Sequence, residues 1–165
     1  TFQGWTALTE QGPNDGTLQL IPIVKGMAYV LTRALLDDVP ENELCGSKAG
    51  KALSINEKYH SLLLEGLISI PKMYPGDTIW WHPDVVHAVE EKHMGKTFSN
   101  VVYVGATPYC KKNIDYIKKQ SKKFIEGKSP PDFAAEDYEV NYKGRTKIND
   151  LSELAKKQLG LIDWN

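Results

Sequence analysis

Tyr74-Pro75-Gly76-Asp77-Thr78-Ile79-Trp80-Trp81-His82-Pro83-Asp84-Val85-Val86-His87 is the stretch that decides the fold of this chain. Its Pro-Gly-Asp start predicts a tight turn, because proline presets one turn dihedral and glycine accepts a positive φ. The aromatic residues after the turn predict a short strand, and His87 opens the next strand. A neutral imidazole on a rigid strand is a good ligand for a divalent metal, so His87 is the first candidate ligand.

The bulk composition describes an ordinary globular chain and excludes several function classes. The chain has 165 residues, 41% of them hydrophobic, which is enough for one packed domain or a piece of one. The net charge of -1 favours neither nucleic acid nor an anionic membrane as a partner. Cys45 and Cys110 are far apart, which argues against a disulfide framework. We therefore expect a cytoplasmic protein with no nucleic-acid or membrane partner.

The first residues of the chain already read as part of a strand. Thr1 is not an initiator methionine, and neither a basic segment nor an apolar signal core follows it. We expect the chain to begin inside a fold and to represent the C-terminal portion of a longer protein.

The pattern along the chain predicts an α+β fold with short strands and outer helices. The first two predicted strands, which a polar loop with the turn signal Asn14-Asp15-Gly16 connects, are expected to pair antiparallel. Ser54-Ile55-Asn56-Glu57 predicts a helix start with Ser54 as the N-cap of a capping box. The expected strands are 4–8, 17–22, 67–70, 77–81, 87–90 and a buried one at 99–104; the expected helices are 26–36, 54–64, 110–127 and a last short one from 150, with Leu154 and Leu159 facing inward.

Two domains follow from the same pattern. Short, evenly separated strands suit a small barrel or jelly roll, which we assign to residues 1–108. Residues 109–165 form a helical, lysine-rich extension that we expect to pack on it.

The turn, the aromatic strand and His87, ten residues after Asp77, resemble the second metal-ligand motif of the iron(II)/2-oxoglutarate-dependent oxygenases. The upstream strands resemble those of the phytanoyl-CoA hydroxylase-like branch. The sequence is most similar to a large uncharacterised subfamily, and the motifs that carry this similarity lie at residues 2–8, 36–40 and 80–82. The resemblance covers nearly the whole chain and says nothing about the substrate.

The resemblance implies a double-stranded β-helix, also called a cupin-like jelly roll, which is incomplete here at its N-terminal side. It implies Fe(II) and 2-oxoglutarate as cofactors and hydroxylation of an unknown small substrate. In that family a His-x-Asp or His-x-Glu pair and a distal histidine hold the iron. His87 matches the distal histidine, and the pair would lie before Trp5, where this chain has none. We therefore expect this chain alone to be inactive.

A second arrangement of ligands stays open at the sequence level. His82-Pro83-Asp84 is itself a His-x-Asp, and residues two apart on a strand point to the same side. However, Pro83 breaks regular strand pairing, and a third ligand should come from another strand. His82 and Asp84 therefore rank behind His87 as metal ligands. We expect His60 and His93 to lie on the surface or on a helix face, away from a metal.

In this family a basic side chain binds the carboxylate of 2-oxoglutarate that lies far from the metal. Lys96 is at about the position where the resemblance places this side chain. Lys96 reads equally well as a solvated loop lysine. Ser99 and Asn100 could hydrogen-bond the same co-substrate, and we expect Trp80, Trp81 and Tyr103 to build the core and the pocket wall.

Two further functions compete with the oxygenase. The chain could be a jelly-roll binding or structural module that has lost iron chemistry, because fold alone does not decide function. A cupin-like isomerase or hydrolase would need more histidines around His87, and the chain has four in all.

Overall fold

The computed structural model describes residues 2–49, 51–131 and 134–164. The chain divides into two compact units, Thr1–Ala106 and Thr107–Asn165, and each is described here by itself. The first unit contains the strands, and the second contains the lysine-rich helix.

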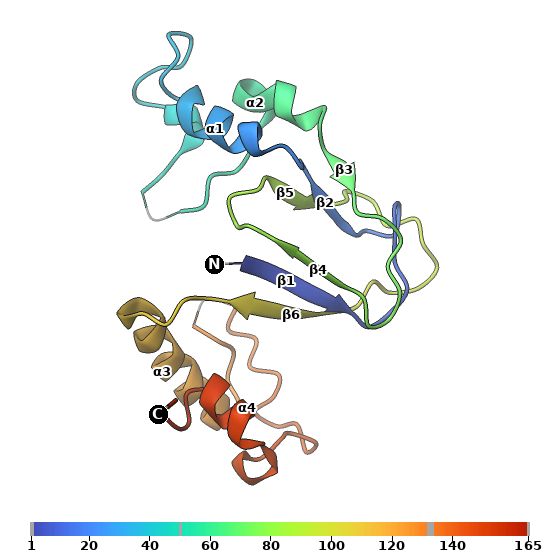
Figure 1. Cartoon of the computed structure of the whole chain (residues 1–165), viewed down its shortest axis with the longest axis vertical. Coiled ribbons are helices and arrows are strands. Elements are labelled where there is room, and N and C mark those ends of the chain that lie inside the picture. Colours follow the sequence, from blue (N-terminus) through green and yellow to red (C-terminus); the bar gives the residue numbers. More distant parts are fainter. Residues whose placement is uncertain (1, 50, 132–133, 165) are drawn as a thin grey trace. The chain divides into compact units, whose positions relative to one another are not determined.

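The elements of the first unit follow in the order that the sequence periodicity predicts (Figure 1). They are β1 (Phe2–Ala7), β2 (Leu18–Leu20), α1 (Val24–Arg33), a 3₁₀ turn (Leu44–Gly46), α2 (Glu57–Leu64), β3 (Ile68–Ser69), β4 (Thr78–Trp81), β5 (His87–Val89) and β6 (Val101–Ala106). The second unit has α3 (Lys111–Glu126), a 3₁₀ turn (Ile148–Asp150) and α4 (Glu153–Gln158). The chain is thus mixed α and β, as predicted.

The strands form two antiparallel sheets of three strands each. The first has the order β4-β1-β6 and the second the order β3-β2-β5. The predicted pairing of the first two strands was wrong, because β1 and β2 belong to different sheets. The loop between them carries the chain from one sheet to the other, and each strand finds its partners much later in the sequence.

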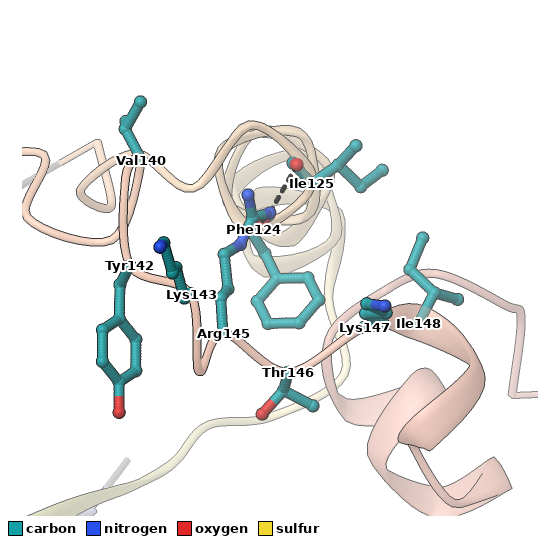
Figure 2. Close-up of a pocket in the computed structure, with 9 residues that line it drawn as sticks. All are labelled: Phe124, Ile125, Val140, Tyr142, Lys143, Arg145, Thr146, Lys147 and Ile148. Carbon is teal, nitrogen blue, oxygen red and sulfur yellow. Dashed lines mark hydrogen bonds between the residues drawn. The ribbon is translucent and has the colours of Figure 1, made fainter.

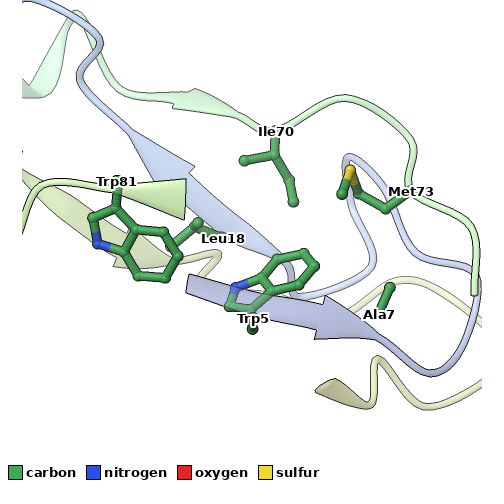
Figure 3. Packing of buried hydrophobic residues seen from close by; sticks show 6 residues of the cluster. All are labelled: Trp5, Ala7, Leu18, Ile70, Met73 and Trp81. Carbon is green, nitrogen blue, oxygen red and sulfur yellow. The ribbon is translucent and has the colours of Figure 1, made fainter. Parts of the chain in front are cut away.

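The main core draws on both sheets and on the segment that joins β3 to β4 (Figure 3). Trp5 and Trp81 come from the first sheet, Leu18 from the second, and Ile70 and Met73 from the joining segment. Trp5 is 3% exposed and Trp81 is 7% exposed. Buried aromatic surface of this size is the main stabilising contribution in a unit with such short strands.

The Pro75-Gly76 turn has the geometry that its sequence predicts. The Asp77 N–H donates to the Tyr74 carbonyl at 2.9 Å, and Gly76 has a φ of 95°. A positive φ at this position strains any residue with a Cβ, so glycine is required there. The Asp77 carboxylate also accepts from the Tyr74 N–H at 2.8 Å, which fixes the start of β4.

Three local predictions need correction. The N-cap of α2 is Asn56, whose side chain accepts from the Tyr59 N–H at 3.0 Å, and not Ser54. The strand predicted at 99–104 begins at Val101 and is largely exposed rather than buried. Leu154 of α4 is 56% exposed and does not face inward. In each case the local pattern predicted the right type of element. Whether the strand and Leu154 are buried depends on the segments that pack against them, which the local pattern does not contain.

A glutamate between β5 and the following loop holds the loop that precedes β2. The Glu90 carboxylate accepts hydrogen bonds from the backbone N–H groups of Asn14, Gly16 and Thr17 at 2.9–3.2 Å, and from the Ser69 hydroxyl. Burial alone would raise the pKa of Glu90, but these donors outweigh it and lower the pKa. The carboxylate therefore stays ionised and fixes the loop against the second sheet.

None of the helices in the described residues is both long enough and apolar enough to cross a lipid bilayer.

Candidate functional site

The second sheet directs His87 toward the first sheet. In β5, His87 lies opposite Leu20 and Val89 lies opposite Leu18, so His87 shares the face that carries the core residue Leu18. The ring of His87 lies 5.7 Å from the ring of Trp81 in the first sheet, measured between centroids. His87 is nevertheless an exposed residue in this chain.

A backbone hydrogen bond holds the His87 ring in one orientation. Its Nδ1 lies 2.7 Å from the Val85 carbonyl oxygen, which can only accept, so Nδ1 carries the proton in the neutral ring. Nε2 then carries the unshared pair, and no described residue donates a hydrogen bond to it. Metal-binding histidines commonly use such a bond through the other nitrogen to fix their tautomer.

His82 and Asp84 lie together, but not with His87. The His82 Nδ1 accepts from the Asp84 N–H at 3.2 Å and lies 3.6 Å from an Asp84 carboxylate oxygen. The ring of His82 packs edge-on against Phe2 at 6.2 Å. Phe2 alternates with Gln3 and Trp5 along β1, so its contact with His82 places that ring on the outer face of the first sheet, away from Trp81 and His87.

His60 was predicted on the surface or on a helix face; it lies in α2 and is fully buried. Its Nδ1 accepts from the Asn56 N–H at 3.3 Å, and its Nε2 has no partner among the described residues. Burial lowers the pKa of His60, and the nearby Arg33 guanidinium lowers it further. His93, by contrast, is exposed as predicted, and its Nδ1 accepts from the Gly95 N–H at 3.1 Å.

The buried neutral His60 predicts that stability decreases in mild acid. In the unfolded chain a histidine takes up a proton near pH ~6.5, whereas the folded chain resists that proton. The stabilising effect is therefore complete above about pH 6.5 and decreases as the pH falls below it. Urea unfolding between about pH 7.5 and pH ~5.5 should show this slope.

The matched variants for this prediction are His60→Gln and His93→Gln. His60→Gln should flatten the pH dependence, and His93→Gln should leave it unchanged. An equal slope in the His60→Gln variant and the original chain would contradict the assignment.

The residues predicted to hold a co-substrate carboxylate lie in and beside the loop before β6. The Ser99 hydroxyl donates to the Asp15 carbonyl at 2.6 Å, and the Asn100 N–H donates to the Thr9 hydroxyl at 2.9 Å. Lys96 is exposed and makes no ion pair with another described residue. No hydrogen bond, ion pair or ring contact within the described part of the chain joins these three residues to His87.

Tyr103, which was predicted to build the core and the pocket wall, lies on the inner face of the first sheet. It lies opposite Trp5 in the pairing of β1 with β6, so it shares the inner face of the first sheet, yet it is 73% exposed. Trp81 is on the same inner face, whereas Trp80 is on the outer one.

The described residues supply one strand-held imidazole toward the space between the sheets, and no second ligand beside it. In residues 2–49, 51–131 and 134–164, no three His, Cys, Asp or Glu side chains are grouped closely enough to hold a metal ion. A metal at His87 would need ligands from further polypeptide.

The sequence pattern of one family matches residues 1–161 of this chain, and its description is Gig2-like. The chain belongs to the Gig2-like family. Among the relatives of this Gig2-like chain is the uncharacterized protein YbiU of Escherichia coli K12, which is 48% identical over 161 residues, or 98% of this chain and 38% of YbiU.

Solved structures of similar proteins share the fold of this Gig2-like chain. The hypothetical protein JW0805 of Escherichia coli has a TM-score of 0.86 at 49% identity, with 97% of this chain and 40% of that chain covered. A Salmonella typhimurium LT2 protein, named provisionally as an oxidoreductase, has a TM-score of 0.87 at 47% identity, with 97% and 38% covered.

A fungal member is also similar to the Gig2-like chain. GlcNAc Inducible Gene 2 (DUF1479) of Candida albicans has a TM-score of 0.83 at 29% identity and is covered to 41%, while all of this chain is covered. This chain thus spans about two fifths of the length of these relatives.

Proposed function

We propose that this chain is the distal-ligand part of a non-haem Fe(II)/2-oxoglutarate-dependent oxygenase whose complete domain is a double-stranded β-helix. The observation that carries the proposal is His87: a strand-held imidazole with its Nδ1 on the Val85 carbonyl and its Nε2 free, facing the opposite sheet. The provisional naming of the Salmonella relative as an oxidoreductase agrees in reaction class.

This chain would supply one of the three protein ligands of such a site, the imidazole of His87. An imidazole is a suitable ligand for Fe(II), and its carbonyl partner fixes the required tautomer. The proposal assigns the other two protein ligands to the additional polypeptide that the longer relatives have. When bound, iron with 2-oxoglutarate and oxygen supplies the oxidising chemistry.

The residues of this chain would orient and shield that centre. The indole of Trp81 packs beside the His87 ring and limits its rotation. The exposed inner-face residues Tyr103 and Val89 would place apolar surface beside that centre, which would keep water from the reacting atoms. Lys96, which is free of ion pairs with the described residues, would attract the far carboxylate of 2-oxoglutarate.

Anaerobic titration of the full-length gene product with Fe(II) and 2-oxoglutarate tests this function. The complex should develop a visible metal-to-ligand absorption band, and the band should require both components. Ferrous ion alone serves as the control.

A full-length product that binds neither component would contradict the oxygenase and would leave the family fold as a binding or structural module. The coding sequence before Thr1 gives an independent check. A His-x-Asp or His-x-Glu encoded within one or two strand lengths upstream supports the proposal, and a full-length gene that encodes no such pair contradicts it.

A further inference from the structure

The second unit contains a cavity that the proposed oxygenase site does not use (Figure 2). It has a volume of about 360 Å³ and lies between the C-terminal end of α3 and the segment that leads to the 3₁₀ turn at Ile148–Asp150. Cavities of this size take small organic molecules. Its lining residues are Phe124, Ile125, Val140, Tyr142, Lys143, Arg145, Thr146, Lys147 and Ile148.

One part of the lining is apolar and partly open to solvent. Phe124 and Ile125 come from the last turn of α3, and Val140 and Ile148 come from the two ends of the facing segment. Ile125 is 52% exposed, Val140 45% and Ile148 41%, so their side chains offer accessible apolar surface. An apolar group of a ligand would remove this surface from water.

The other part of the lining is cationic. Lys143, Arg145 and Lys147 alternate along the chain, and none of them forms an ion pair with a carboxylate in the described residues. The hydroxyl-bearing residues Tyr142 and Thr146 line the same cavity. Three cations without counter-charges attract an anion, and two or more of them favour a doubly charged one.

Arg145 supplies a donor without an acceptor. Figure 2 shows its side chain reaching the end of α3, where one terminal nitrogen donates to the carbonyls of Phe124 and Ile125. Its Nε is buried and has no hydrogen-bond partner among the described residues. Buried N–H donors are normally satisfied. Arg145 therefore has donor capacity that the described residues do not use.

We infer that this cavity binds a phosphate monoester with a compact apolar group. The phosphoryl oxygens accept from Arg145 and pair with Lys143 and Lys147, and the apolar group packs on Phe124, Val140 and Ile148. A phosphate monoester carries nearly two negative charges at neutral pH, which matches this lining better than a carboxylate does. The inference does not rest on the proposed oxygenase function.

Isothermal titration calorimetry of the whole chain with phenyl phosphate tests the inference. Benzoate, inorganic phosphate and benzyl alcohol serve as comparison probes. Phenyl phosphate should bind with a Kd of about 1 mM or below, and the other three probes should bind more weakly. Added salt should weaken the binding, because the attraction is between charges.

Two sets of variants connect the binding to this cavity. The double variant Lys143→Ala/Lys147→Ala keeps the Arg145 bonds to α3 and should weaken phenyl phosphate binding by about tenfold or more. The matched control is Lys112→Ala/Lys118→Ala, which removes the same charge from exposed positions of α3 outside the cavity and should change little. Arg145→Lys keeps a cation but loses the planar fork, so it should also weaken binding, with the helix content checked by circular dichroism.

Three results would overturn the inference. Phenyl phosphate could fail to bind at about 10 mM, which is well above the expected Kd. Binding could be equally strong in the Lys143→Ala/Lys147→Ala variant and in the original chain. Benzyl alcohol could bind as tightly as phenyl phosphate, which would make the cavity an apolar site without anion recognition.

Discussion

Replacing His87 by alanine is expected to abolish the absorption band that Fe(II) and 2-oxoglutarate produce in the full-length gene product. The imidazole is the one candidate ligand that the described residues direct toward the space between the sheets, and its Nε2 is free because Nδ1 is bound to the Val85 carbonyl. Removing a metal ligand outright costs far more than removing a residue that supports one, for which about 10–100-fold is typical. Anaerobic absorption titration of the variant measures the loss.

Two matched histidine variants make this prediction specific. His93→Ala removes an exposed imidazole whose Nδ1 accepts from the Gly95 N–H of its own loop, and it should keep the band. His82→Ala tests the alternative His-x-Asp pair and should also keep the band, since the ring of His82 lies against Phe2 on the other face of β4. If the band survives in His87→Ala but disappears in His82→Ala, the metal ligands are His82 and Asp84 rather than His87.

Replacing Trp5 by alanine is expected to lower the free energy of unfolding by about 3–5 kcal/mol, a large part of the roughly 5–15 kcal/mol that holds a typical domain together. Trp5 is 3% exposed in the central strand of the first sheet and packs among the core residues of both sheets (Figure 3). Alanine would leave a cavity that the surrounding strands cannot fill. Urea denaturation followed by circular dichroism measures the change in midpoint.

Trp80→Ala is the control for the position of the indole. Trp80 is the same residue type in the neighbouring strand, but it lies on the outer face over Gly4 and is 46% exposed. Its removal should cost less than half of what Trp5→Ala costs, because much of its surface is already in water. Equal losses in both variants would contradict the assignment of the inner face to the core.

Local patterns were sufficient for the type and place of most elements. Alternation around Trp5 predicted β1, and the apolar spacing of residues 26–36 predicted most of α1. The predicted tight turn at Pro75-Gly76 was confirmed, because proline fixes its own φ and glycine, which lacks a Cβ, readily takes the positive φ found at Gly76. These signals depend only on residues that are neighbours along the chain.

Long-range pairing and burial could not be predicted in the same way. The two first strands were expected to pair because a turn signal lies between them, yet β1 binds β4 and β6 instead. His60 was expected on the surface or on a helix face, but its complete burial in α2 was not predicted. Both outcomes depend on the free energy of contacts between distant segments, which a short window of sequence does not contain.

For the candidate sites, too, local sequence indicated some residues, whereas tertiary contacts decided how they are arranged. The resemblance to an oxygenase motif made His87 a candidate ligand, but only the register of β5 with β2 showed which face of the sheet it occupies. Lys143, Arg145 and Lys147 were not recognised as a site, although cations at every second position were visible in the sequence. The role proposed for these cations depends on the C-terminal end of α3, because Phe124 and Ile125 line the same cavity.

By itself, the sequence determined the local backbone of this protein: where strands and helices form, and the turn at Gly76. The tertiary structure decided which strands share a sheet, which imidazole faces inward, and which cations meet an apolar wall. The physical reason is that dihedral preferences and periodicity act over a few residues, whereas burial and hydrogen-bond partners are chosen among all segments of the folded chain.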